Sequence, residues 1–100
     1  MRLTPAQTDL IVEKVIEQFG MDARVMLFGS RLDDAARGGD IDLLVESDGR
    51  ATLRQRALAT IGIERALQIP VDIVTLQRGT AGSAFARIAL GSAQALERPA

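Results

Sequence analysis

Two short apolar segments with aspartates near their starts constrain the fold of this 100-residue chain more than any other feature. The first segment, 40–46, contains Asp40 and Asp42, and the second, 70–76, contains Asp72. Apolar runs of this length between turn residues are typical of buried strands. Three carboxylates on core strands suit the binding of metal ions, so we expect a site where these two strands begin.

A first helix is predicted over 5–19, where apolar residues recur at helical spacing. Thr4 and Gln7 have the spacing of an N-terminal capping box, and Pro5 suits the first helical position. Gly20 follows the last periodic residue and is expected to end the helix.

Between this helix and the first aspartates, residues 24–28 are predicted to form a short buried strand that ends at Gly29. A short helix is expected to begin at Ser30 and to reach about Asp34. Residues 37–39 are a predicted turn.

Two further helices are predicted, a long one over 50–68 and a last one over 82–97. The residues predicted to face the core are Leu53, Ala57, Leu58, Ile61 and Leu67 in the first, and Phe85, Ile88, Ala89 and Leu96 in the second.

The connection lengths predict how the strands pair. Only ten residues separate Gly29 from Asp40, fewer than the dozen or more that a parallel crossover usually needs. Strands 24–28 and 40–46 are therefore predicted to be antiparallel. The helical segment between 40–46 and 70–76 is long enough for a right-handed parallel crossover. The predicted fold class is α/β, with a small mixed β-sheet flanked by helices.

These pairings bring the polar residues to one edge of the predicted sheet. Antiparallel pairing places Gly29 and Ser30 near Asp40, and parallel pairing places Asp72 beside Asp40 and Asp42. The topology therefore predicts a site before any resemblance to known proteins is considered.

The chain contains no cysteine and no histidine. The thiolate and imidazole ligands that zinc prefers are therefore missing, as is the usual general base near neutral pH. Metal chemistry must use oxygen ligands, which favour magnesium, manganese or calcium. A general base would have to be a carboxylate, a lysine or the substrate itself.

The net charge of −1 and the pI of about 5.3 differ from the basic character of bulk nucleic-acid binders. The only aromatic residues are three phenylalanines, too few for a platform that stacks bases. No apolar stretch approaches the ~20 residues that span a membrane, and the N-terminus lacks the pattern of a signal peptide. We therefore expect a single cytoplasmic domain over 1–100, with no membrane contact and no direct nucleic-acid partner.

Asp40 and Asp42 are two residues apart on a predicted strand, so both point to one face, while Ile41, Leu43 and Val45 point to the other, against helices. Two carboxylates this close resist simultaneous ionisation unless a cation lies between them. Three carboxylates have the capacity to hold two ions ~3.5–4 Å apart, as in phosphoryl displacement.

The triphosphate of a nucleotide is expected beside these carboxylates. Gly29 allows the backbone to approach a phosphate closely, and the amides that follow it at a helix start favour anions.

This arrangement resembles the nucleotidyltransferase superfamily that includes DNA polymerase β. The shared pattern is Gly29-Ser30, nine intervening residues, Asp40-Ile41-Asp42, and Asp72 on a later strand. It is most similar to the minimal nucleotidyltransferases (MNT) of bacteria and archaea, over nearly the whole chain. Many members of that group accompany a HEPN-domain ribonuclease toxin, and some are antitoxins that transfer AMP from ATP to a toxin tyrosine.

The resemblance implies a polymerase β-like fold and a role for each site residue. Asp40, Asp42 and Asp72 would be the catalytic residues and the ligands of two Mg²⁺ ions, with Asp72 also placed to help deprotonate the acceptor hydroxyl. Gly29 and Ser30 would bind the triphosphate of ATP. The implied partner is a HEPN toxin. The resemblance is also compatible with a homo-oligomer or a hetero-oligomer.

Two other functions remain open at this point. The chain would act as a pure binding module if it neutralised its partner by covering it, with the metal site idle. It would act as a small-molecule nucleotidyltransferase if oligomerisation supplied an acceptor pocket that so short a chain lacks.

Overall fold

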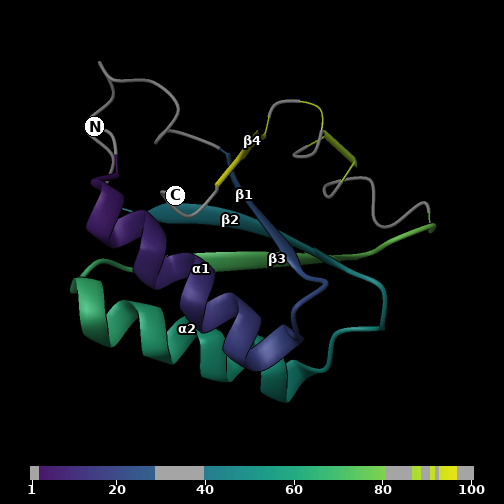
Figure 1. Cartoon of the computed structure of the whole chain (residues 1–100), viewed down its shortest axis with the longest axis horizontal. Coiled ribbons are helices and arrows are strands. Elements are labelled where there is room, and N and C mark those ends of the chain that lie inside the picture. The colour runs from purple at the N-terminus through teal and green to yellow at the C-terminus, as the bar shows by residue number, and fades with distance from the viewer. Residues whose placement is uncertain (1–2, 29–39, 81–86, 89–90, 92, 97–100) are drawn as a thin grey trace.

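The computed structural model describes residues 3–28, 40–80, 87–88, 91 and 93–96. This part of the chain forms two helices and a mixed sheet of four strands, which confirms the α/β class (Figure 1). The elements are α1 (Pro5–Phe19), β1 (Arg24–Phe28), β2 (Ile41–Ser47), α2 (Leu53–Leu67), β3 (Val71–Gln77) and β4 (Gln94–Ala95). The strand order across the sheet is β3-β2-β1-β4.

The strand pairings agree with those predicted from the connection lengths. β1 is antiparallel to β2, with Phe28 opposite Asp42. β2 is parallel to β3, with Asp42 opposite Asp72. The N–H of Ile41 donates to the Pro70 carbonyl at 2.9 Å, so the parallel ladder begins where the two aspartate-bearing strands begin.

Both helices begin with a reciprocal capping box. The Thr4 hydroxyl accepts a hydrogen bond from the Gln7 N–H at 3.1 Å, and the Gln7 side chain accepts one from the Thr4 N–H at 2.9 Å. Thr52 and Gln55 form the same pair at α2, with distances of 3.1 and 2.8 Å. These bonds satisfy backbone donors that have no partner within the helix, so they set where each helix starts.

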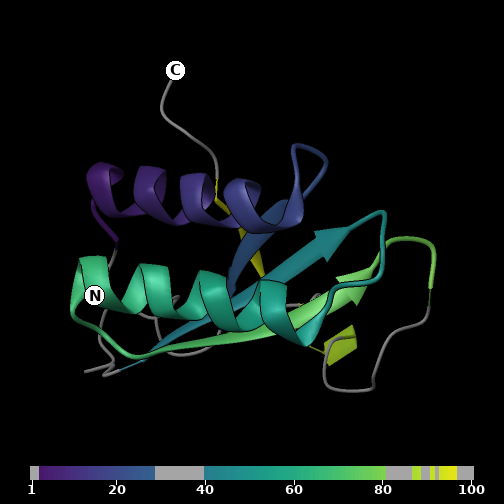
Figure 2. The ribbon, with the colours of Figure 1, turned by 90° about the horizontal axis from the view of Figure 1, so that it is seen from below.

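The two helices lie side by side and cover the same face of the sheet (Figures 1 and 2). Between the helices and the sheet lies the main core, whose residues with the least exposure are Ile11, Val15, Ile41, Leu43, Val45, Ala59 and Ile63. A smaller buried cluster on the opposite face contains Met26, Phe28, Leu44 and Leu76. On β2, Ile41, Leu43 and Val45 face the helices, whereas the opposite face carries Leu44 between Asp42 and Glu46.

The prediction of which residues of α2 face the core is largely wrong. The exposed fractions of Leu53, Leu58 and Ile61 are 72%, 40% and 46%, and Ala57 is also exposed. Ala59 and Ile63 are buried instead. Leu67 packs against the core as predicted. The helix carries apolar residues on two stripes, and helical spacing alone does not decide which one meets a sheet.

The prediction of a helix over 82–97 is wrong at its C-terminal end. Residues 87, 88 and 91 are helical, but Gln94–Ala95 forms β4, which pairs antiparallel with β1. The N–H of Leu96 donates to the Val25 carbonyl at 3.0 Å, and Leu96 packs against the core. The peptide groups on the outer edge of β1 need partners, and satisfying them outweighs local helix propensity.

Ile88, predicted to face the core, is 74% exposed. Phe85 and Ala89 lie outside the described residues, as do the short helix expected over 30–34 and the turn over 37–39.

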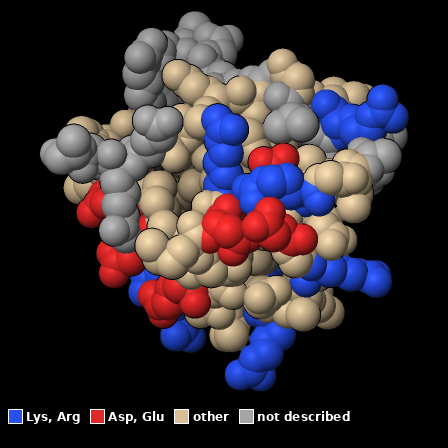
Figure 3. Space-filling view, turned by 45° about the vertical axis from the view of Figure 1, so that its right-hand side comes forward, with Lys and Arg blue, Asp and Glu red and all other residues tan. Residues whose placement is uncertain are grey.

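Charged residues of both signs meet at the C-terminal ends of β2 and β3. Arg78 forms ion pairs with Asp48 and with Glu46, the latter at 3.5 Å, and donates a hydrogen bond to the Asp22 carbonyl at 3.0 Å. Among the described residues on the face in Figure 3, acidic and basic side chains lie side by side. This mixture differs from the continuous basic surface typical of nucleic-acid binding. The described helices include none long and apolar enough to cross a membrane.

Candidate functional site

The start of β2 presents two of the three predicted aspartates. Asp40 directly precedes the strand and is exposed, and Asp42 is half-buried within it. Ile41 and Leu43 are completely buried in the core beneath the helices. The alternation of a strand therefore directs the apolar residues to the helices and Asp42 to the opposite face, as predicted.

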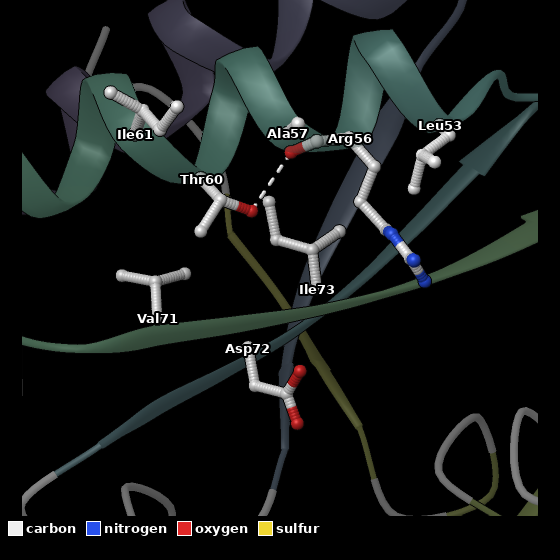
Figure 4. A pocket seen from close by; sticks show the side chains of 8 residues that line it. All are labelled: Leu53, Arg56, Ala57, Thr60, Ile61, Val71, Asp72 and Ile73. Carbon is white, nitrogen blue, oxygen red and sulfur yellow. Dashed lines mark hydrogen bonds between the residues drawn. The ribbon is translucent and has the colours of Figure 1, made fainter.

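Asp72 is the second residue of β3 and is exposed. Its position opposite Asp42 follows from the parallel register. Figure 4 shows that the Asp72 side chain points away from α2, whereas Val71 and Ile73 point toward that helix. Asp42 and Asp72 therefore share the face of the sheet opposite α1 and α2.

The beginning of β3 is tied to the end of α2. The carboxylate of Glu64 accepts a hydrogen bond from the Val71 N–H at 2.7 Å. A bond to a charged acceptor is stronger than one between neutral groups. Glu64 thus holds the residue immediately before Asp72.

The carboxylates interact electrostatically. The pKa of Asp42 is raised above its ordinary value, first because burial disfavours the charged form and then because Asp72 and Asp40 are negatively charged neighbours. A bound cation would remove this repulsion.

The starts of β2 and β3 offer carboxylate oxygens to a metal ion. In the part of the chain that the structure describes, no group of three or more acidic side chains is arranged to hold an ion. Magnesium commonly takes only one or two carboxylates and completes its shell with water and substrate phosphates. The adjacent carboxylates of Asp42 and Asp72, with Asp40 one residue before the strand, fit an oxygen-binding ion of this kind.

The predicted triphosphate-binding residues, Gly29 and Ser30, lie outside the described residues. The strand that leads to them ends at Phe28, which is opposite Asp42. Their role stays a prediction.

A groove of about 380 Å³ lies between α2 and β3, next to Asp72 (Figure 4). It is lined by Leu53, Arg56, Ala57, Thr60, Ile61, Val71, Asp72 and Ile73. This groove was not predicted from the sequence, because Leu53, Ala57 and Ile61 were expected to face the core. The sequence of α2 also contains a second apolar stripe with Ala59 and Ile63. Two stripes on one helix indicate that only one of them packs against the sheet.

A small mixed sheet covered by helices on one face, with acidic residues at the starts of two adjacent parallel strands, defines a polymerase β-like nucleotidyltransferase fold. The chain belongs to the nucleotidyltransferase domain family, whose model matches residues 9–96. A comparison with curated proteins found no match.

Several solved structures share this fold. One is the Shewanella oneidensis complex of a tri-AMPylated HEPN toxin with an MNT antitoxin, with a TM-score of 0.66, 19% identity, and coverage of 96% of this chain and 74% of that one. A mutant of the MntA–HpeT toxin–antitoxin has a TM-score of 0.69 and 18% identity, with 97% and 75% coverage. A second such mutant has a TM-score of 0.63 and 21% identity, with 88% and 69% coverage. At these identities the likeness establishes the fold.

Proposed function

We propose that this nucleotidyltransferase transfers AMP from ATP to a tyrosine hydroxyl of a HEPN-type toxin and thereby acts as its antitoxin. The observation that carries the proposal is the position of Asp42 opposite Asp72, with Asp40 just before the strand, in a member of this family. A chain with the same fold occurs in a complex whose HEPN toxin is AMPylated.

In the proposed reaction, the acceptor oxygen attacks the α-phosphorus of ATP, and pyrophosphate leaves. Asp72 is exposed at the sheet edge and would accept the proton of the attacking hydroxyl. Asp40, Asp42 and Asp72 would bind two Mg²⁺ ions, as the resemblance to the family implies. Gly29 and Ser30 would bind the triphosphate. Bound Mg²⁺ would supply positive charge to the phosphates during the displacement.

A second candidate is a non-catalytic antitoxin that neutralises its partner by complex formation alone. The exposed apolar side chains of Leu53 and Ile61 on α2 favour it, because such surface is typical of a face that binds a partner. The two candidates differ in whether the carboxylates are needed for neutralisation.

The test is to incubate the purified chain with Mg²⁺, ATP and the HEPN-type toxin encoded beside it, and to measure the intact mass of the toxin. We expect a gain of one or more AMP units, which Asp42→Asn and Asp72→Asn abolish. Asp9→Asn on the exposed surface of α1 is the matched control and should leave the transfer unchanged. A tight complex without any mass gain would contradict the proposed transfer and support the second candidate.

A further inference from the structure

The groove between α2 and β3 is lined mainly by apolar side chains and is open to solvent. Leu53 and Ile61 on its helical side are 72% and 46% exposed. Val71 and Ile73 form its floor on the strand side (Figure 4). Exposed apolar surface gathered in one place usually marks a binding site.

β3 is at the end of the described sheet, with β2 as its neighbour on one side. The hydrogen bonds at the two ends of β3 show which peptide groups face β2. The Pro70 carbonyl accepts from the Ile41 N–H, and the Arg78 N–H donates to the Ser47 carbonyl at 2.7 Å. Since alternate residues of a parallel strand direct their peptide groups to opposite sides, even-numbered residues of this strand face β2 and odd-numbered residues face the open edge.

One of these outward groups already has a partner. The Val71 N–H is bound by the Glu64 carboxylate, which agrees with its outward direction. The outward peptide groups of Ile73 and Thr75 follow along the strand. Among the described residues no strand pairs with this edge, and such an edge is a template for another extended segment.

Side chains alternate across this edge. Val71 and Ile73 point toward the groove, and Asp72 points to the other face (Figure 4). Directly opposed side chains on neighbouring strands are about 4.5–5.5 Å apart at Cβ. An added segment would therefore place one residue beside Asp72 and the two residues that flank it in the groove.

Arg56 places a positive charge in the groove. It lines the groove, and its side chain extends from α2 toward β3 (Figure 4). Within the described ranges its guanidinium forms no ion pair. Guanidinium groups bind carboxylates strongly, so an acidic residue in the added segment would complement it.

We infer that the open edge of β3 binds the acceptor as an extended segment of the partner protein. The acceptor hydroxyl lies beside Asp72, its two neighbours are apolar and occupy the groove, and an acidic residue near them pairs with Arg56. The inference rests on the proposed function, because it describes how that function's acceptor reaches the site.

The test uses two synthetic peptides, Glu-Thr-Ile-Tyr-Ile-Thr-Glu, in which both glutamates share the groove face with the isoleucines, and the same sequence with both isoleucines replaced by serine. Each is titrated into the isotope-labelled chain with Mg²⁺ and ATP. Amide chemical shifts report binding, and intact mass reports AMP on the peptide. We expect the isoleucine peptide to shift the Ile73 and Thr75 amides and to bind about tenfold or more tightly than the serine peptide.

Two matched substitutions on α2 test the groove itself. Ala57→Arg fills the groove and should remove the binding, whereas Ala66→Arg, at an exposed position of the same helix outside the groove, should not change it. Equal effects of the two substitutions, equal affinity for the two peptides, or no shift at Ile73 and Thr75 would overturn the inference. Binding at this edge without AMP transfer to the peptide would support the docking surface and count against the proposed function.

Discussion

Asp42 and Asp72 occupy opposite positions on two adjacent parallel strands, and both belong to the face of the sheet opposite α1 and α2. Burial is the main cause of the raised pKa of Asp42, and the neighbouring charges of Asp72 and Asp40 add to it. The ionised carboxylates therefore lower the free energy of unfolding of the metal-free chain. A bound cation would relieve this repulsion.

Asp42→Asn should stabilise the metal-free protein at neutral pH. Because the pKa of Asp42 is raised in the folded state, the folded chain binds more protons than the unfolded chain just above the ordinary aspartate pKa of about 4. Wild-type stability therefore falls as the pH rises through this window. The advantage of Asp42→Asn should be full above the raised pKa and vanish below about pH 4.

Urea unfolding in the presence of a chelator measures this difference. Adding Mg²⁺ should reduce the advantage of the asparagine variant, because the cation stabilises only the chain that keeps the carboxylate. A variant less stable than wild type at pH 7 would show that the carboxylate has a favourable partner.

Ile63→Ala should lower the free energy of unfolding by about 2–5 kcal/mol, because Ile63 is completely buried between α2 and the core. Ile61→Ala, two residues away, should cost less than about 1 kcal/mol, because Ile61 is 46% exposed. Chemical denaturation of both variants measures the difference. Equal losses would mean that the stripe containing Ile61 is covered in solution.

Gly62→Ala should stabilise the chain by up to about 1 kcal/mol, since alanine favours a helix interior over glycine. The added Cβ would meet the flexible side chain of Lys14 at 3.4 Å, an ordinary contact. Gly20→Ala is the contrasting change, because Gly20 has φ of +103° and alanine there is strained. Thermal unfolding should place the melting temperatures on opposite sides of the wild-type value.

Glu64→Ala should destabilise the start of β3 by about 1–3 kcal/mol, because the Val71 N–H would lose a charged acceptor. Glu64→Gln keeps an acceptor oxygen and should recover most of the loss. Hydrogen exchange of the Val71 amide distinguishes the two variants. Fast exchange in both would show that the negative charge, rather than the acceptor atom, holds the strand.

Local signals in the sequence determined much of this fold. The capping box of Thr4 and Gln7 set the start of α1, and the ten residues between Gly29 and Asp40 were too few for a parallel crossover. Because the strand pairings follow from connection length, the juxtaposition of Asp42 with Asp72 was predictable without coordinates.

Tertiary structure alone decided which apolar stripe of α2 is buried and where the chain near Ala95 pairs. Local sequence offered two apolar stripes and an alanine-rich segment with helical spacing. The choice depended on the space beneath Ala59 and Ile63 and on the unpaired edge of β1, which are properties of the assembled sheet. The groove beside Asp72 exists because the stripe containing Ile61 was the one left uncovered.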